Sequence, residues 1–382
     1  MAVGELARAE ALYRDGLHQL GSSTDFKAER ASCLLHGSEI ASRSGNSQEA
    51  IARARAAEQA IQGTPLEWNL QGLNILTNLA MVLGDAGKFR EADQRFQDAY
   101  ALISQLGYED SQKAAKLFNG WALTLAYDGR QLDAEKIYRR ALDISRSQDG
   151  DQGVAPALLF NYASLLHQLG RKDDAARYLQ FASAKAQALH DNIVTEDTDL
   201  LRAQMYTDQH QLVKASAVLD DLESRLRRRY PPEHYVFAEV ASARSAIALA
   251  RGDTPSATHY AHQAIALDEA SLRRIGQCAA YLPTLLIRRS QVELKSGDAE
   301  SAAADARRAL DLLHDEANTG IPSSNVGRAN LVLAQALGAS GGQDEAKPAS
   351  RSAYANLLTT LGSEHPDTQL SRELADARLP SH

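Results

Sequence analysis

Apolar residues along this chain recur every three or four positions in successive segments, which is the spacing of one face of an α-helix. Residues 113–128 place Leu117, Trp121 and Leu125 on one such face, and residues 131–146 do the same with Tyr138 and Leu142. A short glycine-containing turn separates the two segments. The same arrangement of two helical segments around a turn recurs along the chain, so the sequence predicts an all-α protein.

Three columns of residues recur at an interval of about 42 residues. The first column is an alanine, found at Ala9, Ala50, Ala92, Ala134, Ala175, Ala215, Ala257, Ala302 and Ala346. Five residues earlier lies the turn residue, found at Gly4, Gly45, Gly87, Gly129, Gly170, His210, Gly252, Gly297 and Gly341. Twelve residues before the alanine lies a small residue, found at Ser38, Ala80, Ala122, Ala163, Ala203, Ser245, Ser290 and Ala334. A fixed period of this kind indicates stacked repeats. At His210, a residue other than glycine is expected to be tolerated if that turn does not need a positive φ.

The columns have a simple physical interpretation. Each unit is expected to contain two antiparallel helices joined at the turn, and the small residues mark the point where the two helices cross most closely. One helix pair cannot bury its apolar face alone, so neighbouring pairs stack and share a continuous core. The expected fold class is therefore an all-α, right-handed superhelical solenoid of antiparallel helix pairs.

These columns match the signature positions of the tetratricopeptide repeat (TPR) family. Aromatic residues also lie four positions after the column alanine, at Tyr13, Phe96 and Tyr138, and small residues seven positions after it, at Ala57, Ala99, Ala141, Ala182, Ala264, Ala309 and Ala353. The chain resembles TPR proteins over nearly its whole length. Its period near 42 rather than about 34 residues is similar to the long-helix subtype found in kinesin light chains.

We expect a single solenoid over residues 1–382. Residues 1–21 are expected to form the second helix of an incomplete unit, and residues 364–378 a C-terminal capping helix. Eight helix pairs are expected between them, at residues 23–63, 66–107, 109–148, 154–191, 193–230, 233–272, 275–317 and 322–361. The half unit suggests a fragment of a longer protein, because a solenoid end normally carries a capping element. The alternative is that Met1 is the true start and the first helix is itself the cap.

Several C-terminal stretches resemble the TPR tails of bacterial multidomain serine/threonine kinases. They include ALARGD, LLIRRSQVELKSGDAESAAADARRALDLL, GRANLVLAQALGASG and LGSEHPDTQLSRELA. The resemblance implies that a covalently linked kinase domain precedes residue 1, in some such proteins with a membrane span between the two. A cytoplasmic location is expected, or an extracytoplasmic one if a membrane-spanning segment precedes the chain.

Charge and hydropathy narrow the choice of partner. The chain has 41 basic and 49 acidic residues and a net charge of −8, so it is a poor generic ligand for nucleic acid. No apolar run approaches the roughly 20 residues that span a bilayer, so no membrane insertion is expected within the chain. Cys33 and Cys278 are too far apart in sequence to indicate a metal site or a disulfide framework.

Motifs for catalysis are missing from the sequence. It has no glycine-rich phosphate loop, no kinase catalytic motifs and no Walker A motif, so no kinase activity, no other enzymatic activity and no cofactor are expected. His259 and His262 have a spacing that can share a metal ion, but no third ligand accompanies them, and packing or solvated histidines are favoured.

The His-Pro-Asp triplet at residues 365–367 resembles the loop of J-domain co-chaperones, although the surrounding helices do not match. The arginines of residues 225–229 are expected to interact with the negative end of a helix, with a docking patch as the alternative.

The first helices of TPR units line the concave face, where peptides bind in that family. The residues expected there are Asn74, Asn78, Met81, Lys116, Asn119, Leu123, Tyr127, Asn161, Ser164, His167, Arg288, Gln291, Lys295 and Arg328. An asparagine side chain can donate to a carbonyl and accept from an N–H of a bound peptide at once, so Asn78, Asn119 and Asn161 are candidate clamps. The alternative is that these amides cap or bridge helices within the wall of the groove.

Three functional hypotheses follow. The leading one is a scaffold or regulatory module that binds a protein or peptide partner on its concave face, as part of a larger bacterial signalling protein. The second is a TPR regulator that senses a peptide signal, which predicts one tight pocket and a conformational change on binding. The third is an enzyme whose site is hidden within the superhelix, which would require clustered acids or histidines with strongly shifted pKa values in a deep groove.

Overall fold

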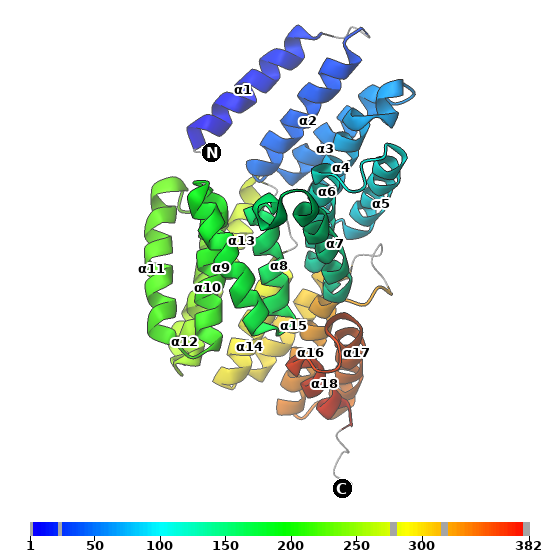
Figure 1. Ribbon diagram of the computed structural model, residues 1–382. Coiled ribbons are helices and arrows are strands. Elements are labelled where there is room, and N and C mark those ends of the chain that lie inside the picture. Colours follow the sequence, from blue (N-terminus) through cyan, green and yellow to red (C-terminus); the bar gives the residue numbers. More distant parts are fainter. Residues whose placement is uncertain (1–2, 22–24, 276–280, 315–319, 377–382) are drawn as a thin grey trace.

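The computed structural model describes residues 3–21, 25–275, 281–314 and 320–376 (Figure 1). Over these ranges the chain consists of α-helices, two short 3-10 turns and no strand, so the expected all-α solenoid is confirmed. The α-helices are α1 (Val3–Gln19), α2 (Lys27–Arg43), α3 (Ser47–Ile61), α4 (Leu70–Asp85), α5 (Phe89–Gln105), α6 (Gln112–Tyr127), α7 (Gln131–Asp149), α8 (Pro156–Gln168), α9 (Lys172–Ala188), α10 (Asn192–Asp208), α11 (Leu212–Arg229), α12 (Val236–Ala250), α13 (Thr254–Ile275), α14 (Leu282–Ser296), α15 (Ala299–Leu313), α16 (Ser324–Ala339), α17 (Gln343–Leu361) and α18 (Pro366–Asp376). None of these helices is long and apolar enough to cross a membrane.

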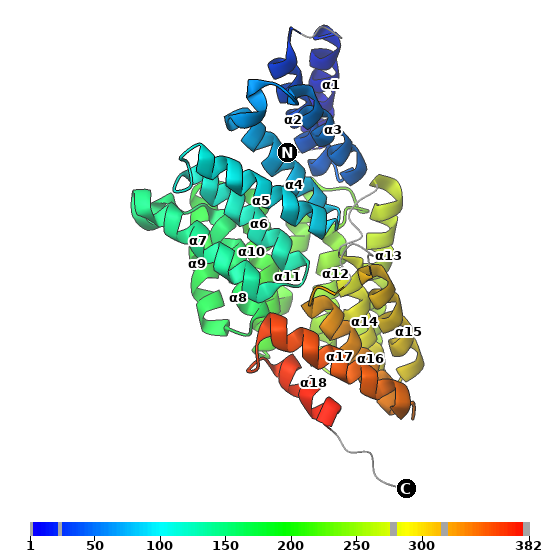
Figure 2. The same cartoon turned by 90° about the vertical axis from the view of Figure 1, so that its right-hand side faces the viewer.

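Each even-numbered helix from α2 to α16 packs against the odd-numbered helix that follows it. The even-numbered helices also pack against one another, as α4 does on α6 and α10 does on α12, and they form the inner layer of the superhelix. At the two ends, α1 packs on α2 and α18 packs on α17 (Figures 1 and 2). Stacking of neighbouring pairs therefore builds the molecule.

Small side chains lie where the two helices of each pair cross. All eight small residues that precede the column alanine by twelve positions are buried, with exposed fractions between 0% and 4%. In three units this residue is a serine, and its hydroxyl donates to the backbone carbonyl of the column alanine. The donor and acceptor residues are Ser38 and Ala50 at 2.9 Å, Ser245 and Ala257 at 2.7 Å, and Ser290 and Ala302 at 2.6 Å. Such a short approach leaves no room for a larger side chain.

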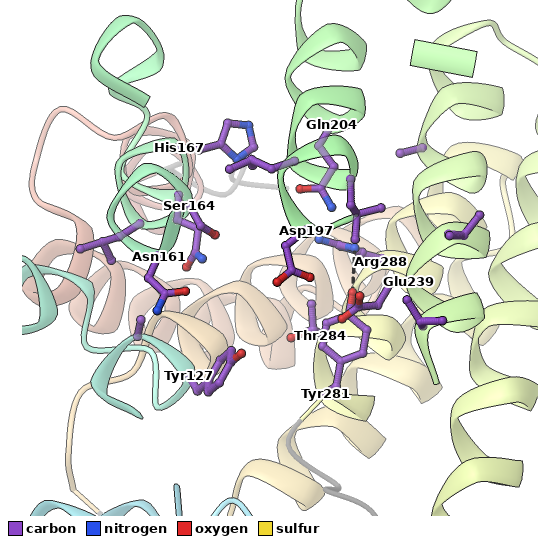
Figure 3. A pocket seen from close by; sticks show the side chains of 18 of the residues that line it. Tyr127, Asn161, Ser164, His167, Asp197, Gln204, Glu239, Tyr281, Thr284 and Arg288 are labelled. Carbon is purple, nitrogen blue, oxygen red and sulfur yellow. Dashed lines mark hydrogen bonds between the residues drawn. The ribbon is translucent and has the colours of Figure 1, made fainter. Parts of the chain in front are cut away.

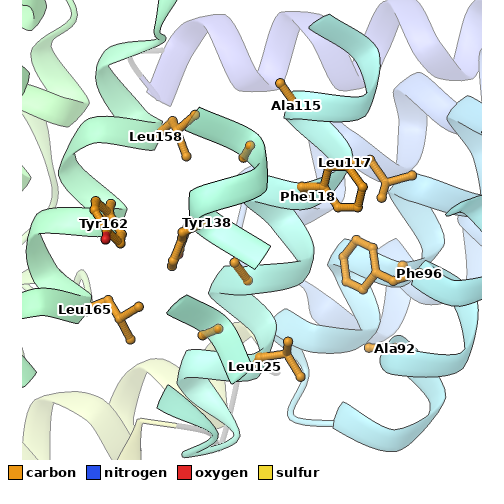
Figure 4. Packing of buried hydrophobic residues seen from close by; sticks show 14 of the residues in the cluster. Ala92, Phe96, Ala115, Leu117, Phe118, Leu125, Tyr138, Leu158, Tyr162 and Leu165 are labelled. Carbon is orange, nitrogen blue, oxygen red and sulfur yellow. The ribbon is translucent and has the colours of Figure 1, made fainter. Parts of the chain in front are cut away.

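Aromatic side chains fill the core between the pairs (Figure 4). Phe96 of α5 is fully buried, and its ring is stacked on that of Trp121 of α6 with the ring centroids 6.1 Å apart. The Trp121 indole nitrogen donates to Asp93 at 2.7 Å, which satisfies its polar edge. Tyr138 of α7 is also fully buried and lies 6.0 Å from the ring of Tyr162 of α8. These contacts join one unit to the next, because each aromatic pair spans two elements.

The superhelix closes on itself. The segment before α16 contacts the turn between α6 and α7, where the Ser323 hydroxyl donates to the carbonyl of Asp128 at 2.7 Å. The backbone N–H of Ser324 donates to the Gly129 carbonyl at 2.9 Å, and the Asn325 amide donates to the Tyr127 carbonyl at 2.8 Å. α17 also lies beside α7 (Figure 1). Helices α6 to α18 therefore form a ring, although the contacting segments are almost 200 residues apart in sequence.

A second contact supports this closure from α18. The His365 ring Nε2 lies 3.1 Å from the Gln168 carbonyl at the end of α8, and the Asp367 backbone N–H donates to the other ring nitrogen, Nδ1. Because Nδ1 accepts a hydrogen bond, Nε2 carries the proton and donates it to Gln168. Burial lowers the pKa of His365, which favours this neutral form. The His-Pro-Asp triplet therefore has a structural role, because it holds the start of α18 against the end of α8.

The turn at His210 differs from expectation. Its φ is +55°, inside the left-handed region that Gly170 and Gly252 occupy at the equivalent turns, so this turn does adopt a positive φ and the condition for tolerating another residue is not met. A side chain in this conformation costs roughly 1–2 kcal/mol, although histidine tolerates it better than a β-branched residue does. Gly4, expected as the turn of the first unit, lies inside α1 instead.

Replacing His210 with glycine is expected to raise the free energy of unfolding by about 1 kcal/mol, because relief of the strained φ outweighs the extra flexibility of the unfolded chain. Chemical denaturation measures the change. His314→Gly is the control: His314 has an ordinary φ of −81°, so glycine there brings no relief and should be neutral or destabilising. Equal effects at the two positions would contradict the prediction.

Candidate functional site

The closed ring surrounds a cavity of about 1320 Å³ that is partly open to solvent. Its walls are formed by the inner helices α6, α8, α10, α12 and α14, and residues of α16 and α18 complete them (Figure 3). The lining mixes apolar side chains, such as Leu123 and Phe160, with amides, hydroxyls and carboxylates. A large, walled space of mixed polarity is the form that ligand sites commonly take.

The repeat determines which residues face the cavity. The residue directly after the small column position lines it in α6, α8, α10, α12 and α14, at Leu123, Ser164, Gln204, Ala246 and Gln291. The residue six positions before the small residue lines it in four successive units, at Asp197, Glu239, Thr284 and Arg328. The two positions are seven residues apart on one helix, which is roughly two helical turns, so both lie on the same helix face.

Eight of the residues expected on the concave face line the cavity. They are Leu123, Tyr127, Asn161, Ser164, His167, Arg288, Gln291 and Arg328. The other six lie outside it: Asn74, Asn78, Met81, Lys116, Asn119 and Lys295. Five of the six belong to α4 and α6, and of these helices only the last residue of α4, Asp85, and the second half of α6 line the cavity. That these fourteen residues bind a ligand remains a prediction.

The three candidate clamp asparagines have different surroundings. Asn78 lies between neighbouring units, with its side-chain oxygen 2.9 Å from the Ser38 hydroxyl. The Asn161 amide donates to the Asn119 side-chain oxygen at 3.1 Å, and this hydrogen bond bridges α6 and α8. Only Asn161 lines the cavity. In this structure Asn78 and Asn119 therefore bridge neighbouring helices, as the alternative to a peptide clamp proposes.

Carboxylates that sequence reasoning did not select lie in the cavity wall. Burial raises the pKa of Glu239 to about 8 and that of Asp197 to about 7, and burial raises the pKa of Asp268 to about 6. The neighbouring Asp197 adds to the shift at Glu239, because each charge disfavours the other. Glu239 and Asp197 keep part of their surface exposed to the cavity. The repeat register could have identified both residues, since they occupy the column position of Asn74 and Lys116.

Basic side chains in the wall are fewer, and both of its arginines have hydrogen-bond partners. One Arg288 nitrogen donates to the Ser242 hydroxyl at 2.8 Å and lies 3.4 Å from the Tyr281 hydroxyl. Arg328 donates to Asp367 at 2.9 Å. In total, seven carboxylates and three lysine or arginine side chains line the cavity, so its interior is acidic.

The other sequence candidates have structural roles in the described ranges. The arginines of residues 225–229 bond mainly to acidic side chains, with Arg229 donating to Glu196 at 3.0 Å and Arg225 donating to Asp199 and Asp221. His262 lies 3.3 Å from an Arg289 nitrogen. No group of three or more potential metal ligands comes together in the part of the chain that the structure describes. Cys278 lies outside the described residues.

No protein-family model and no curated protein sequence matches the chain. Solved structures similar to it include NprR in complex with its cognate peptide NprX, at 13% identity and a TM-score of 0.62, covering 93% of this chain and 98% of that one. A Rap protein complexed with competence and sporulation factor has 12% identity and a TM-score of 0.56, covering 93% and 99%. The Rap conjugation gene regulator of the plasmid pLS20, in complex with the Phr* peptide, has 13% identity and a TM-score of 0.54, covering 94% and 99%. These likenesses show that the fold is TPR-like.

Proposed function

We propose that this chain is a protein-interaction module that binds a peptide, or a short extended segment of a protein, inside the closed cavity. The observation that carries the proposal is the enclosed space of about 1320 Å³. Pockets for small molecules span about 300–1,000 Å³, so this cavity has room for a longer ligand. Several inner helices form the walls around that ligand.

The wall offers groups that suit a peptide backbone. Amide side chains recur in it, on Asn161, Gln204, Gln291 and Asn325, and each can donate to a carbonyl and accept from an N–H. Apolar side chains between them can accept aliphatic side chains of the ligand. Recognition of backbone by amides and of side chains by apolar pockets is a general mode of peptide binding.

The structural neighbours support the same proposal. NprR and two Rap proteins are described in complex with peptides, and their chains have the same overall course as this one. Their likeness favours, within the proposal, a regulator that senses a peptide signal over a passive scaffold. In such a regulator the ligand would stabilise the closed ring, because only the closed form offers all the walls at once.

A selection from a library of random seven-residue peptides tests the proposal. We expect peptides that bind the parent chain and fail to bind Ser164→Phe, in which a ring added to α8 occupies the cavity. Ser104→Phe is the matched control, because Ser104 is exposed on α5 outside the cavity. Peptides bound equally well by Ser164→Phe would place the site elsewhere, and a selection without any binder would remove the proposed function.

Three finer proposals rest on sequence resemblance. They are that the repeats belong to the long subtype similar to kinesin light chains, that a kinase domain precedes residue 1 in the native protein, and that the protein is cytoplasmic. Sequencing the coding region upstream of Met1 tests the second proposal, and the absence of a kinase reading frame would remove it. We also propose that the chain has no catalytic activity of its own, since its sequence carries no catalytic motif.

A further inference from the structure

We infer that the ligand of this cavity carries a positive charge, a lysine or arginine side chain, which Asp197 of α10 and Glu239 of α12 bind between them. The inference rests on the proposed function and names the chemical class of its ligand. It predicts a basic peptide as the ligand.

The repeat places the two carboxylates side by side. Asp197 and Glu239 occupy the same column position on adjacent inner helices, which pack against each other. In Figure 3 both side chains lie at the open space of the cavity, with Gln204, Tyr281 and Arg288 around them. A cation in this position would have one carboxylate on each side.

Asp197 and Glu239 differ from three other acidic residues of the wall in forming no ion pair within the described ranges. Among the described residues, neither side chain forms an ion pair, and Arg288 is hydrogen bonded to Ser242 and Tyr281 instead. Glu196, Asp208 and Asp367 are paired with Arg229, His167 and Arg328 respectively. The charge of Arg288 lowers the pKa of Glu239, but burial and the charge of Asp197 outweigh it, so a cationic ligand would supply the positive charge that the two carboxylates lack.

Asp268 provides an independent observation at the same site. It also lines the cavity, from α13, and its residue surface is only 7% exposed. Its Oδ2 atom is buried and has no hydrogen-bond partner among the described residues. A buried carboxylate oxygen without a partner is costly unless a ligand supplies the donor. The charge of Asp268 raises the pKa of Glu239, as the charge of Asp197 does, so the three acidic residues belong to one site.

The energetic consequence favours a cationic ligand. Because burial holds the pKa values of Asp197 and Glu239 at about 7 and about 8, both carboxyls are partly protonated near neutral pH in the empty cavity. A bound guanidinium or ammonium favours the charged form and supplies the missing hydrogen-bond donors. An organic cation is favoured over a metal ion, since no group of three close ligands is present in the described ranges.

Three pools of labelled random heptapeptides test the inference, with the central residue fixed as arginine, glutamine or glutamate. Fluorescence anisotropy gives the mean affinity of each pool for the parent and for the double variant Asp197→Asn/Glu239→Gln. We expect the parent to bind the arginine pool at least ten times more tightly than the glutamate pool. The double variant should bind the pools within about twofold of one another, because its amides carry no charge.

The matched control is Asp143→Asn/Glu373→Gln, which removes two exposed carboxylates outside the cavity and should keep the parent's preference. A pH series on the parent is a second measurement that needs no variant. Preference for arginine should increase from pH 6 to pH 8.5, as carboxyls whose pKa values lie at about 7 and about 8 lose their protons, and it should stay flat in the double variant.

These measurements distinguish failure of the charge preference from failure of peptide binding. If peptides bind and Ser164→Phe abolishes binding, but the arginine pool has no advantage or the double variant keeps it, the inference is wrong and the proposed function stands. If no pool binds the parent, the proposed function itself fails. If free arginine amide competes as well as the peptides do, the ligand is a small cation, and the peptide part of the inference is overturned.

Discussion

Replacing Phe96 with alanine is expected to lower the free energy of unfolding by about 3–5 kcal/mol. The side chain is 0% exposed and belongs to the largest apolar cluster, which extends from α2 to α10 and also includes residues of α16 and α17. Its ring stacks on Trp121 and lies 3.5 Å from the position that a Cβ on Gly120 would occupy, so it fills the space that this glycine leaves open. Alanine would leave a cavity that neighbouring helices can close only in part.

Equilibrium denaturation of the parent and the variant measures this loss. Phe181→Ala is the matched control, since Phe181 is 52% exposed on α9 and its removal should change stability by no more than about 0.5 kcal/mol. A small loss for Phe96→Ala would mean that the α5–α6 contact does not hold adjacent units together. A large loss for Phe181→Ala would indicate that its exposed face is covered in solution.

Replacing Gly129 with alanine is expected to open the ring. The φ of Gly129 is +85°, which costs an alanine roughly 1–2 kcal/mol, and its new Cβ would lie 2.3 Å from the Ser323 hydroxyl and 2.8 Å from the Ser324 nitrogen. Both atoms belong to the hydrogen bonds that close the ring, so the backbone contact itself must separate. We expect roughly 1–3 kcal/mol of further loss and a larger radius of gyration in solution scattering.

Gly252→Ala separates the two contributions. Gly252 occupies the same turn of a later unit with a φ of +78°, but nothing lies within 4 Å of its would-be Cβ. This control should show the backbone cost alone, with an unchanged radius of gyration. Equal losses and equal dimensions for the two variants would contradict the closed ring. A ligand that occupies the cavity should partly restore closure in Gly129→Ala, because it binds the closed form better than the open one.

Local periodicity determined most of the fold. The columns of small residues, turn glycines and alanines were sufficient to predict helix pairs, because each column reports a contact between neighbours in sequence. The buried serine column illustrates this well: Ser290 lies twelve residues from its acceptor, Ala302. The inner position of the first helices was also readable, and Ser164 and Gln291 line the cavity as the repeat register implies. His210 marks a limit, since the sequence alone did not show that its turn requires a positive φ.

The tertiary structure alone decided the closure of the ring and the composition of the site. Closure depends on the small rotation from one unit to the next, summed over several units, and on contacts such as that between Asn325 and Tyr127, which are 198 residues apart in sequence. No repeat column reports such a contact. The accumulated rotation of the units also places Asp197 and Glu239 in the cavity wall. Lys116, at the equivalent position of an earlier unit, lies outside the cavity. The sequence by itself determined the repeating unit and its inner face, and the accumulated geometry of the superhelix determined which part of that face became a site.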